Sequence, residues 1–414
     1  MNNFCNNSKE RYFFIIFKTS DQLSFGKSLN AVPMAKRILS LPLFILISSL
    51  FFYLGEARAQ TNDPLETSFP TIMESDSNRL FFRFDNLNFI KNNEYFSDYA
   101  RGYTTLGFIL TPQLDYHPGP HSKISAGAHM LKYSGRNTFH KTTPIFSFQY
   151  AFNSDFNLIV GSLSDPLNHK LPEPLFDFER YFLEQNETGL QLIYQHKKIY
   201  TDFWIAWEQF ILEDEPFQEK FTIGLTTEIE LLKKGRLSVG VPANFLFRHH
   251  GGQINDSDDP LVSIFNGAWG LDLEVQFPSK PRIKKISIKS QYFKYEDLSV
   301  TREQAFKDGH AFYSMFQVAF KRATIMTGYW DAHEFIAPIG HPLYQSVSSS
   351  KPYIEGRDRH LWNTKLIFHQ ALSKDIRIGL RTEFFYDLDV LKLDYAYAFF
   401  LSFRRNYQLK RIQY

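Results

Sequence analysis

The alternation of apolar and polar residues near the end of the chain constrains the fold more than any other feature of the sequence. From Leu391 to Phe403, the odd-numbered positions are all large and apolar, and most even-numbered positions are charged or small. A repeat of two residues predicts a β-strand with one apolar face. Similar segments recur from Arg79 to Arg404 about every 20 residues without a helical segment between them. This pattern predicts an all-β protein with a closed antiparallel transmembrane β-barrel.

The connections between these segments fall into two alternating classes. Short turns such as Asn153-Ser154 and Lys197-Lys198 follow the even-numbered strands, and longer loops follow the odd-numbered ones, the longest being 164–186 and 332–356. Short periplasmic turns, long extracellular loops and an even strand number are typical of bacterial outer-membrane barrels. We predict about 16 strands, at 79–87, 102–116, 121–134, 142–152, 155–163, 187–197, 199–210, 218–232, 235–249, 261–277, 282–294, 309–320, 322–331, 357–371, 374–386 and 391–404.

The N-terminal region predicts export. Ala35-Lys36-Arg37 precedes an apolar run from Ile38 to Leu54, and Ala57-Arg58-Ala59 follows it, which is the pattern of a signal peptide and its cleavage site. We therefore interpret residues 1–33 as a non-native upstream extension and 34–59 as a signal peptide cleaved near Ala59. Residues 60–78 are then a short periplasmic segment, 79–404 the transmembrane barrel and 405–414 a basic periplasmic tail.

Composition excludes several classes of protein. After residue 59 the chain has 39 Lys and Arg against 41 Asp and Glu, a net charge of −2, so no nucleic-acid partner is expected. The only cysteine, Cys5, lies in the removed part. Because no long apolar helix follows residue 59, a membrane-embedded chain must be a barrel. Export and the barrel pattern together predict a Gram-negative outer membrane, with its lipid as a partner.

Aromatic residues support a membrane-facing barrel. They make up 17% of the chain, and outer-membrane barrels carry aromatic girdles at both interfaces. Trp207, Trp269, Trp330 and Trp362 all fall at the loop ends of predicted strands. We therefore expect these four side chains at one membrane interface, where the indole ring is buried and its N–H stays wet.

A barrel of sixteen strands is too wide for its wall side chains to fill, so an aqueous channel is expected. The 19 residues from Gln60 to the first strand are too few for a separate plug domain. Alternation places basic residues on one side of the lumen and acidic residues on the other, a transverse field that would orient polar solutes. The predicted pore-lining residues are Arg83, Asp202, Glu208, Glu228, Glu230, Asp272, Glu274, Lys365, Arg377, Arg381 and Lys392.

The loop 164–186 is rich in acidic and aromatic residues. Here the chain resembles the trimeric Gram-negative porins, in which the third loop folds into the barrel and its acids face a basic wall. The resemblance implies a constriction loop with Glu173, Asp177, Glu179, Arg180 and Glu184. The loop lacks the acidic-glycine tip of general porins, and a basic tail follows the terminal aromatic residue, so trimerisation or another homo-oligomer stays open. The alternative is a loop that lies over the rim.

No catalytic, cofactor or metal site is expected. His249 and His250 precede a loop with three Asp residues, but without the ligand spacing of a metal site. No G-x-S-x-G nucleophile motif is present. The chain is thus predicted to be a non-enzymatic channel for passive diffusion of small polar or charged solutes. The alternatives are a barrel that recognises a surface partner or serves an export complex and, third, an outer-membrane lipid hydrolase.

Overall fold

The computed structural model describes residues 72–412, apart from 165, 184–186, 253, 255, 279–281 and 352–355. The predicted upstream extension and signal peptide lie outside the described residues. In the part of the chain that is described, no helix combines the length and hydropathy needed to cross a membrane. The helical elements are short: the 3₁₀ helices η2 (Glu74–Asp76), η3 (Pro166–His169) and η4 (Pro342–Tyr344), and the α-helix α2 (Arg180–Leu183).

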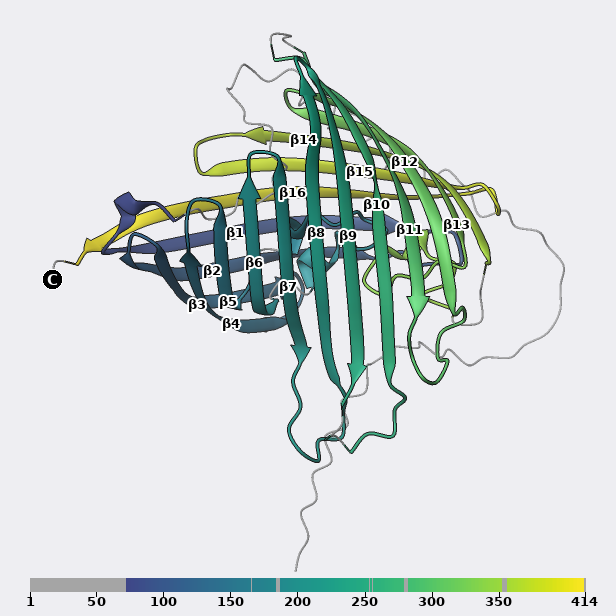
Figure 1. Ribbon diagram of the computed structural model, residues 1–414, viewed down its shortest axis with the longest axis horizontal. Coiled ribbons are helices and arrows are strands. Elements are labelled where there is room, and N and C mark those ends of the chain that lie inside the picture. Colours follow the sequence, from purple (N-terminus) through teal and green to yellow (C-terminus); the bar gives the residue numbers. More distant parts are fainter. Residues whose placement is uncertain are drawn as a thin grey trace, which may run out of the picture. The chain divides into compact units, whose positions relative to one another are not determined.

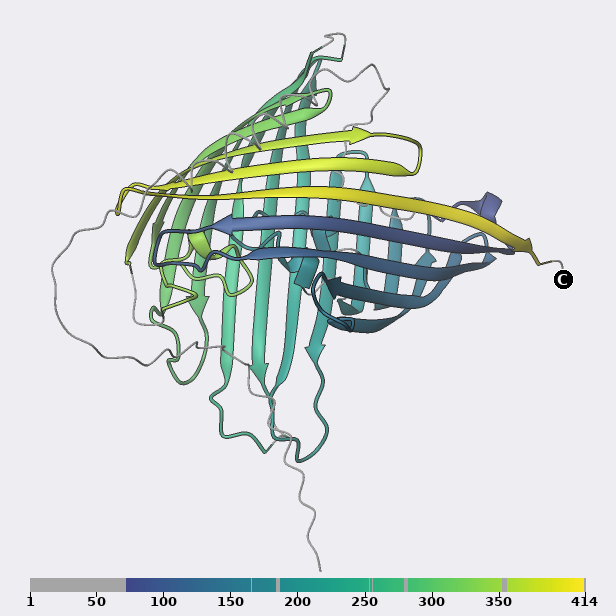
Figure 2. The same ribbon diagram turned by 180° about the vertical axis from the view of Figure 1, so that it is seen from behind.

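Sixteen antiparallel strands form a closed barrel, which confirms the predicted fold (Figures 1 and 2). Each strand pairs with its neighbours in sequence, and β1 pairs with β16 to close the sheet. The strands are β1 (Arg79–Glu94), β2 (Thr104–Gly119), β3 (Ser122–Tyr133), β4 (Lys141–Ala151), β5 (Phe156–Ser162), β6 (Thr188–His196), β7 (Ile199–Gln209), β8 (Glu219–Lys234), β9 (Leu237–Gly251), β10 (Val262–Gln276), β11 (Ile283–Asp297), β12 (Asp308–Phe320), β13 (Ala323–His333), β14 (Asp358–Ala371), β15 (Ile376–Asp387) and β16 (Lys392–Arg411).

The last strand shows how alternation sorts residues between the two faces. Ala396 and Ala398 are buried on the lumen side, whereas Leu393 is 45% exposed on the outer face. β16 continues to Arg411, which pairs with Arg79 of β1. The predicted strand end at residue 404 was therefore wrong, and residues 405–411 belong to the barrel wall. The outward positions of this extension still carry Tyr407 and Leu409, so the apolar face continues.

The wall differs in strand length around the barrel. β5 has seven residues, whereas β8 has sixteen, and Figure 1 shows the run from β3 to β7 as shorter arrows. The last pair between β4 and β5 is Ser147 with Gly161, so the first six residues of β4 extend beyond β5. The loop that joins β5 to β6 therefore leaves the barrel wall at a level closer to the turn end than the loop-side end of β4.

The tryptophan prediction is correct in part. Trp207, Trp269 and Trp362 are 39–49% exposed on the outer face near the loop ends. Trp330, in contrast, has no exposed surface and points into the lumen. The position of Trp330 along β13 predicts the interface, but its parity puts the side chain on the lumen face, where loop residues cover it.

The two faces should respond differently to an added charge. Phe316 is 42% exposed on the outer face of β12, and its neighbour Gln317 lines a lumen cavity. We expect Phe316→Arg to destabilise the barrel by about 2–4 kcal/mol in a bilayer, because the charge would enter the apolar band. Gln317→Arg should cost far less. Refolding titrations into vesicles, read by heat-modifiable gel mobility, measure the difference, and equal losses would contradict the assignment of faces.

Candidate functional site

Two long loops fold into the lumen. We call the connection from β5 to β6 loop 3 (163–187) and that from β13 to β14 loop 7 (334–357). Leu175 of loop 3 and Phe335 of loop 7 have no exposed surface. Both belong to one apolar cluster with Trp330 and Phe293 of the wall. The predicted entry of the third loop into the barrel is thus what the structure shows, and the entry of loop 7 was missed.

The loops are joined to each other by backbone contacts. The N–H of Asp177 donates to the carbonyl of Ile339 at 2.7 Å, and that of His341 donates to Glu173 at 3.1 Å. Gly340 lies between these two bonds, and a Cβ there would meet the carbonyl oxygen of Pro174 at 2.0 Å. Only glycine allows the two backbones to approach this closely.

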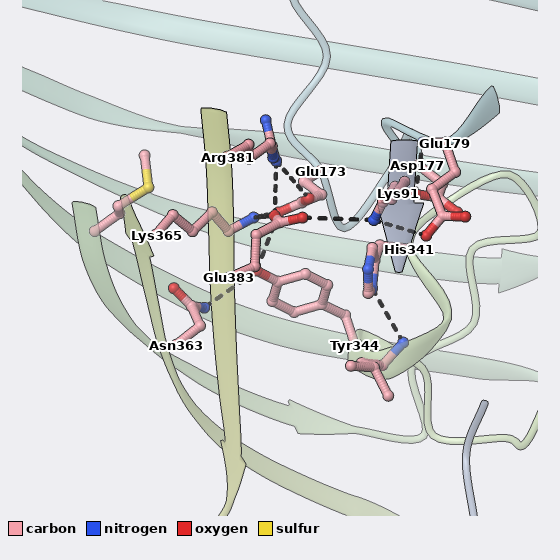
Figure 3. A network of polar contacts seen from close by, with 12 residues as sticks. Lys91, Glu173, Asp177, Glu179, His341, Tyr344, Asn363, Lys365, Arg381 and Glu383 are labelled. Atoms are coloured by element: carbon pink, nitrogen blue, oxygen red, sulfur yellow. Dashed lines mark hydrogen bonds and ion pairs between the residues drawn. The ribbon is translucent and has the colours of Figure 1, made fainter. Parts of the chain in front are cut away.

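A cluster of six charged side chains attaches loop 3 to the wall (Figure 3). Glu173 of loop 3 pairs with Lys365 of β14 and with Arg381 of β15, the latter at 3.1 Å. Glu383 of β15 accepts from Arg381 at 2.8 Å and lies 3.3 Å from Lys365. The Glu173 carboxylate of the loop therefore bridges Lys365 and Arg381, the same two cations that the Glu383 carboxylate of the wall contacts.

The other half of this charged cluster lies on β1. The Lys91 ammonium lies 2.9 Å from Glu179 of loop 3 and 3.7 Å from Glu383. Tyr103 and Asn93 also donate to Glu179. Burial alone would raise the pKa of Glu179, but Lys91 and Tyr103 hold it below its usual range. The charged cluster, defined as Lys91, Glu173, Glu179, Lys365, Arg381 and Glu383, is formally neutral.

Asp177 and His341 lie beside the charged cluster (Figure 3). Asp177 accepts the N–H of Glu179 at 3.0 Å, and burial raises the pKa of its carboxyl. The Nδ1 of His341 accepts from the N–H of Leu343 at 3.3 Å, and its Nε2 lies 3.4 Å from the Tyr95 hydroxyl. Within the described ranges, no group of three His, Cys, Asp or Glu could hold a metal ion. The arrangement is suited to holding a loop.

His169 fastens the start of loop 3 to the opposite wall. Its Nδ1 lies 2.7 Å from Asp202 of β7, its Nε2 lies 2.9 Å from Glu187, and its ring stacks on Trp204 with centroids 3.7 Å apart. Burial alone would lower the pKa of His169, but Glu187 and Asp202 raise it to about 9. The imidazole is therefore a buried cation between two carboxylates.

Loop 3 leaves open space on both of its sides. A cavity of about 380 Å³ lies between loop 3 and the wall from β9 to β15. It shares Pro242, Asp272, Lys285 and Lys289 with a wider space of about 520 Å³ at the turn end of the lumen. A smaller cavity of about 180 Å³ lies against β1 to β5. The lumen is thus narrowed and divided at the level of loop 3.

By strand alternation, the predicted pore-lining residues lie on the lumen face. Many of them form ion pairs with neighbouring residues of opposite charge. Asp202 holds His169, Glu208 binds Arg248 at 2.7 Å, and Glu228 binds Lys170 at 2.8 Å. Lys285 and Lys289 offset Glu274 and Asp272 in the same way. The transverse field predicted from charge parity is consequently broken into local pairs. The remaining predicted residues on this face are Arg83, Glu230, Lys365, Arg377, Arg381 and Lys392.

The predicted constriction-loop residues have different fates. Glu173 and Glu179 do face basic residues of the wall, although they contact them directly rather than across an open gap. Arg180 lies over the ring of Phe176, 5.8 Å from its centroid. Glu184 lies outside the described residues. The sequence patterns did not predict that loop 7, Lys91 and His169 belong to the interior site. For loop 7 the sequence does contain a signal, because the apolar run Phe335-Ile336-Ala337 is unusual for an exposed loop.

Comparisons with known proteins give one family and a set of distant folds. The lipid A 3'-O-deacylase-type family matches residues 72–412. No curated protein matches the chain. Among solved structures, OpdL of Pseudomonas aeruginosa is 12% identical with a TM-score of 0.49, over 80% of this chain and 99% of that one. OprD of the same species is 10% identical with a TM-score of 0.46, over 84% and 97%. At such values the likeness bears on neither substrate nor mechanism.

His169 should make the stability of the barrel depend on pH. Because its folded pKa is raised, its contribution is fully present below about pH 6.5 and is lost as the pH rises through about 9. The loss should be on the order of 3 kcal/mol. We expect the melting temperature to fall over this range in the natural protein and to fall less in His169→Gln.

The matched control for this pH profile is His196→Gln, which removes an exposed imidazole beside Asp155. Its profile should follow that of the natural protein. An unchanged profile in His169→Gln would show that the His169 cation does not hold loop 3.

Proposed function

The chain belongs to the lipid A 3'-O-deacylase-type family, and from the charged lumen of its barrel we propose that it is an outer-membrane channel for small polar or charged solutes. The outer face carries exposed Leu, Ile, Phe and Trp side chains between the turn and loop ends, as a lipid-facing wall requires. In this proposal the turn end faces the periplasm and the long loops face the cell exterior. The solute passes without chemical change.

The observation that supports this proposal is the continuous charged space on the turn side of loop 3. The cavities of about 380 and 520 Å³ meet at Asp272, Lys285 and Lys289, so hydrated solutes have room up to the level of the charged cluster. Beyond that level the apolar cluster of loops 3 and 7 narrows the lumen. Low conductance with strong dependence on both loops is therefore expected.

Loop packing should control conductance. Gly340→Val would place side-chain atoms against the backbone of Pro174 and force loops 3 and 7 apart, and deletion of 170–182 would remove the obstruction. Both changes should raise the single-channel conductance in a planar bilayer. Gly119→Val is the matched control, because a Cβ at Gly119 has no neighbour closer than 3.8 Å. A folded barrel that conducts in none of these forms would eliminate the channel.

Charged residues that line the two joined cavities on the turn side of loop 3 should determine whether the channel prefers cations or anions. Lys285→Gln should shift the reversal potential under a salt gradient towards cation selectivity, and Glu228→Gln towards anion selectivity. Both shifts should shrink at about 1 M salt, where the Debye length falls to about 3 Å. Reversal potentials that both substitutions leave unchanged would mean that ions do not pass this cavity.

Lipid hydrolysis is the second candidate function, favoured by the family and by one side-chain contact. On the outer face, the Nδ1 of His249 lies 2.8 Å from the Ser263 hydroxyl, near the loop ends of β9 and β10. Phe221 and Phe247 lie beside His249 on the outer face, with their ring centroids 5.2 and 6.4 Å from the centroid of the imidazole. An imidazole beside a hydroxyl is the pairing that activates a serine nucleophile.

Mass spectrometry of lipid A incubated with the reconstituted barrel tests this second function. Loss of an acyl chain that Ser263→Ala and His249→Ala both abolish would make the chain a deacylase. His310→Ala, on the same outer face, is the control. An unchanged lipid A mass with the natural protein would leave the His249–Ser263 pair a structural contact.

A further inference from the structure

The last strand has an open backbone edge at the turn end of the barrel. β15 pairs with β16 only as far as Phe403, and one further bond joins the N–H of Arg404 to the carbonyl of Asp375 at 2.9 Å. On its other side, β16 stays paired with β1 as far as Arg411. Figures 1 and 2 show β16 running past β15 towards the end marked C. Among the residues that the structure describes, 405–411 therefore have a strand partner on one side only.

The open side carries backbone groups that can form hydrogen bonds. Successive residues of an antiparallel strand direct their N–H and C=O groups to opposite sides in turn. The N–H of Arg404 points to the β15 side, so the groups of Asn406 point to the same side, where no described strand pairs with them. Asn406 and every residue from there to Arg411 are exposed. An exposed edge of this kind is a template for pairing with another chain.

The edge is strongly basic. Residues 404–411 include Arg404, Arg405, Lys410 and Arg411 and no acid. Arg405 pairs with an aspartate of the neighbouring turn, whereas Lys410 and Arg411 form no ion pair within the described ranges. A partner that approaches this edge meets a positive charge, so electrostatic complementarity favours an acidic partner.

The paired side holds the edge in its extended conformation. The ring of Tyr407 stacks on Phe82 of β1, with centroids 6.4 Å apart. The Nη1 of Arg79 donates to the side-chain oxygen of Gln408 at 3.3 Å. Because the strand is already ordered, a peptide that pairs with it meets a preorganised edge, and preorganisation lowers the entropic cost of binding.

We propose that residues 404–411 bind an extended acidic segment of a partner protein, which adds to the sheet as a further strand. In this mode of recognition, backbone hydrogen bonds supply affinity and side chains supply specificity. The turn end faces the periplasm in the function proposed above, so the partner is a periplasmic protein or domain. Only this compartment rests on the proposed function, because the pairing does not depend on whether the barrel conducts.

Fluorescence anisotropy of a labelled octapeptide of alternating Val and Glu, titrated with the refolded full-length barrel in detergent, tests the proposal. Asn406→Pro removes the open N–H and leaves the bonds to β1 in place, because proline is tolerated on the unpaired side of an edge strand. It should weaken peptide binding about three- to tenfold, the effect of one lost hydrogen bond. Asn406→Thr keeps the N–H and is the matched control, which should bind like the natural barrel.

The charge of the edge is tested with the same peptide. Lys410→Gln combined with Arg411→Gln should weaken binding by a similar factor at low salt, and by less at about 1 M salt, where the Debye length is about 3 Å. Lys233→Gln combined with Lys234→Gln is the matched control, since these two exposed lysines lie at the turn end of β8. An octapeptide of alternating Val and Lys should bind at least about tenfold more weakly than the Val-Glu peptide.

Heat-modifiable gel mobility checks the folding of each variant. If Asn406→Pro does not fold, a Val-Glu octapeptide with every amide N-methylated replaces it, and the natural barrel should not bind this peptide. The proposal is overturned if the natural barrel does not bind the Val-Glu octapeptide, or if Asn406→Pro binds it as tightly as Asn406→Thr.

Equal losses in the Lys233 and Lys234 variant and in the Lys410 and Arg411 variant would also overturn the proposal, because binding would then follow overall charge. Binding that needs the charges of Lys410 and Arg411 but not the N–H of Asn406 would make this edge a contact for anionic lipid headgroups instead. Conductance measurements do not enter this test.

Discussion

The pairing of loop 3 carboxylates with cations of the barrel wall is the interaction on which the interior depends. Lys91 and Lys365 are at most 4% exposed, and their anionic partners come from both the loop and β15. Removing one member of a buried ion pair costs about 3–5 kcal/mol, because the other charge is left without a partner. The wall therefore requires the loop as much as the loop requires the wall. Division of the lumen into separate cavities follows from this mutual requirement.

Apolar packing and ion pairing stabilise the lumen loops in different ways. The apolar cluster of loops 3 and 7 with Trp330 and Phe293 excludes water from the region towards the loop end. Such packing is not directional and would tolerate a shift of the loops. The charged cluster and the backbone bonds from Asp177 to Ile339 and from His341 to Glu173 are directional, so they fix the register.

Much of the fold could be predicted because alternation is a local signal. All sixteen strands were found, and the largest errors lie where alternation weakens or changes character. The end of β1, at Asn92-Asn93-Glu94, is polar on both faces, and the end of β16 is rich in basic residues. Strand pairing between β1 and β16 extends both elements. That pairing joins residues more than 300 positions apart in the sequence, so no local sequence pattern can predict it.

The interior site was less predictable for the same reason. Parity predicts Lys365 and Arg381 on the lumen face, and the porin resemblance implies that Glu173 and Glu179 lie on a constriction loop. Their partnership depends on where loop 7 lies, and nothing local links Gly340 to Pro174. Lys91 was missed because the predicted first strand ended at residue 87. A charged residue could be given a face from sequence, but its partner came only with the tertiary structure.

The two candidate functions use opposite faces of the same strands, which makes them physically independent. On β9 the side chain of Asn244 faces the turn-side lumen cavity, whereas His249 faces outward beside Ser263. Because neighbouring residues of a strand point to opposite faces, a substitution on one face leaves the other in place. A channel in the lumen and lipid chemistry on the outer wall are thus compatible in one barrel. The His249–Ser263 pair lies on the outer face, and the cavities lie in the lumen.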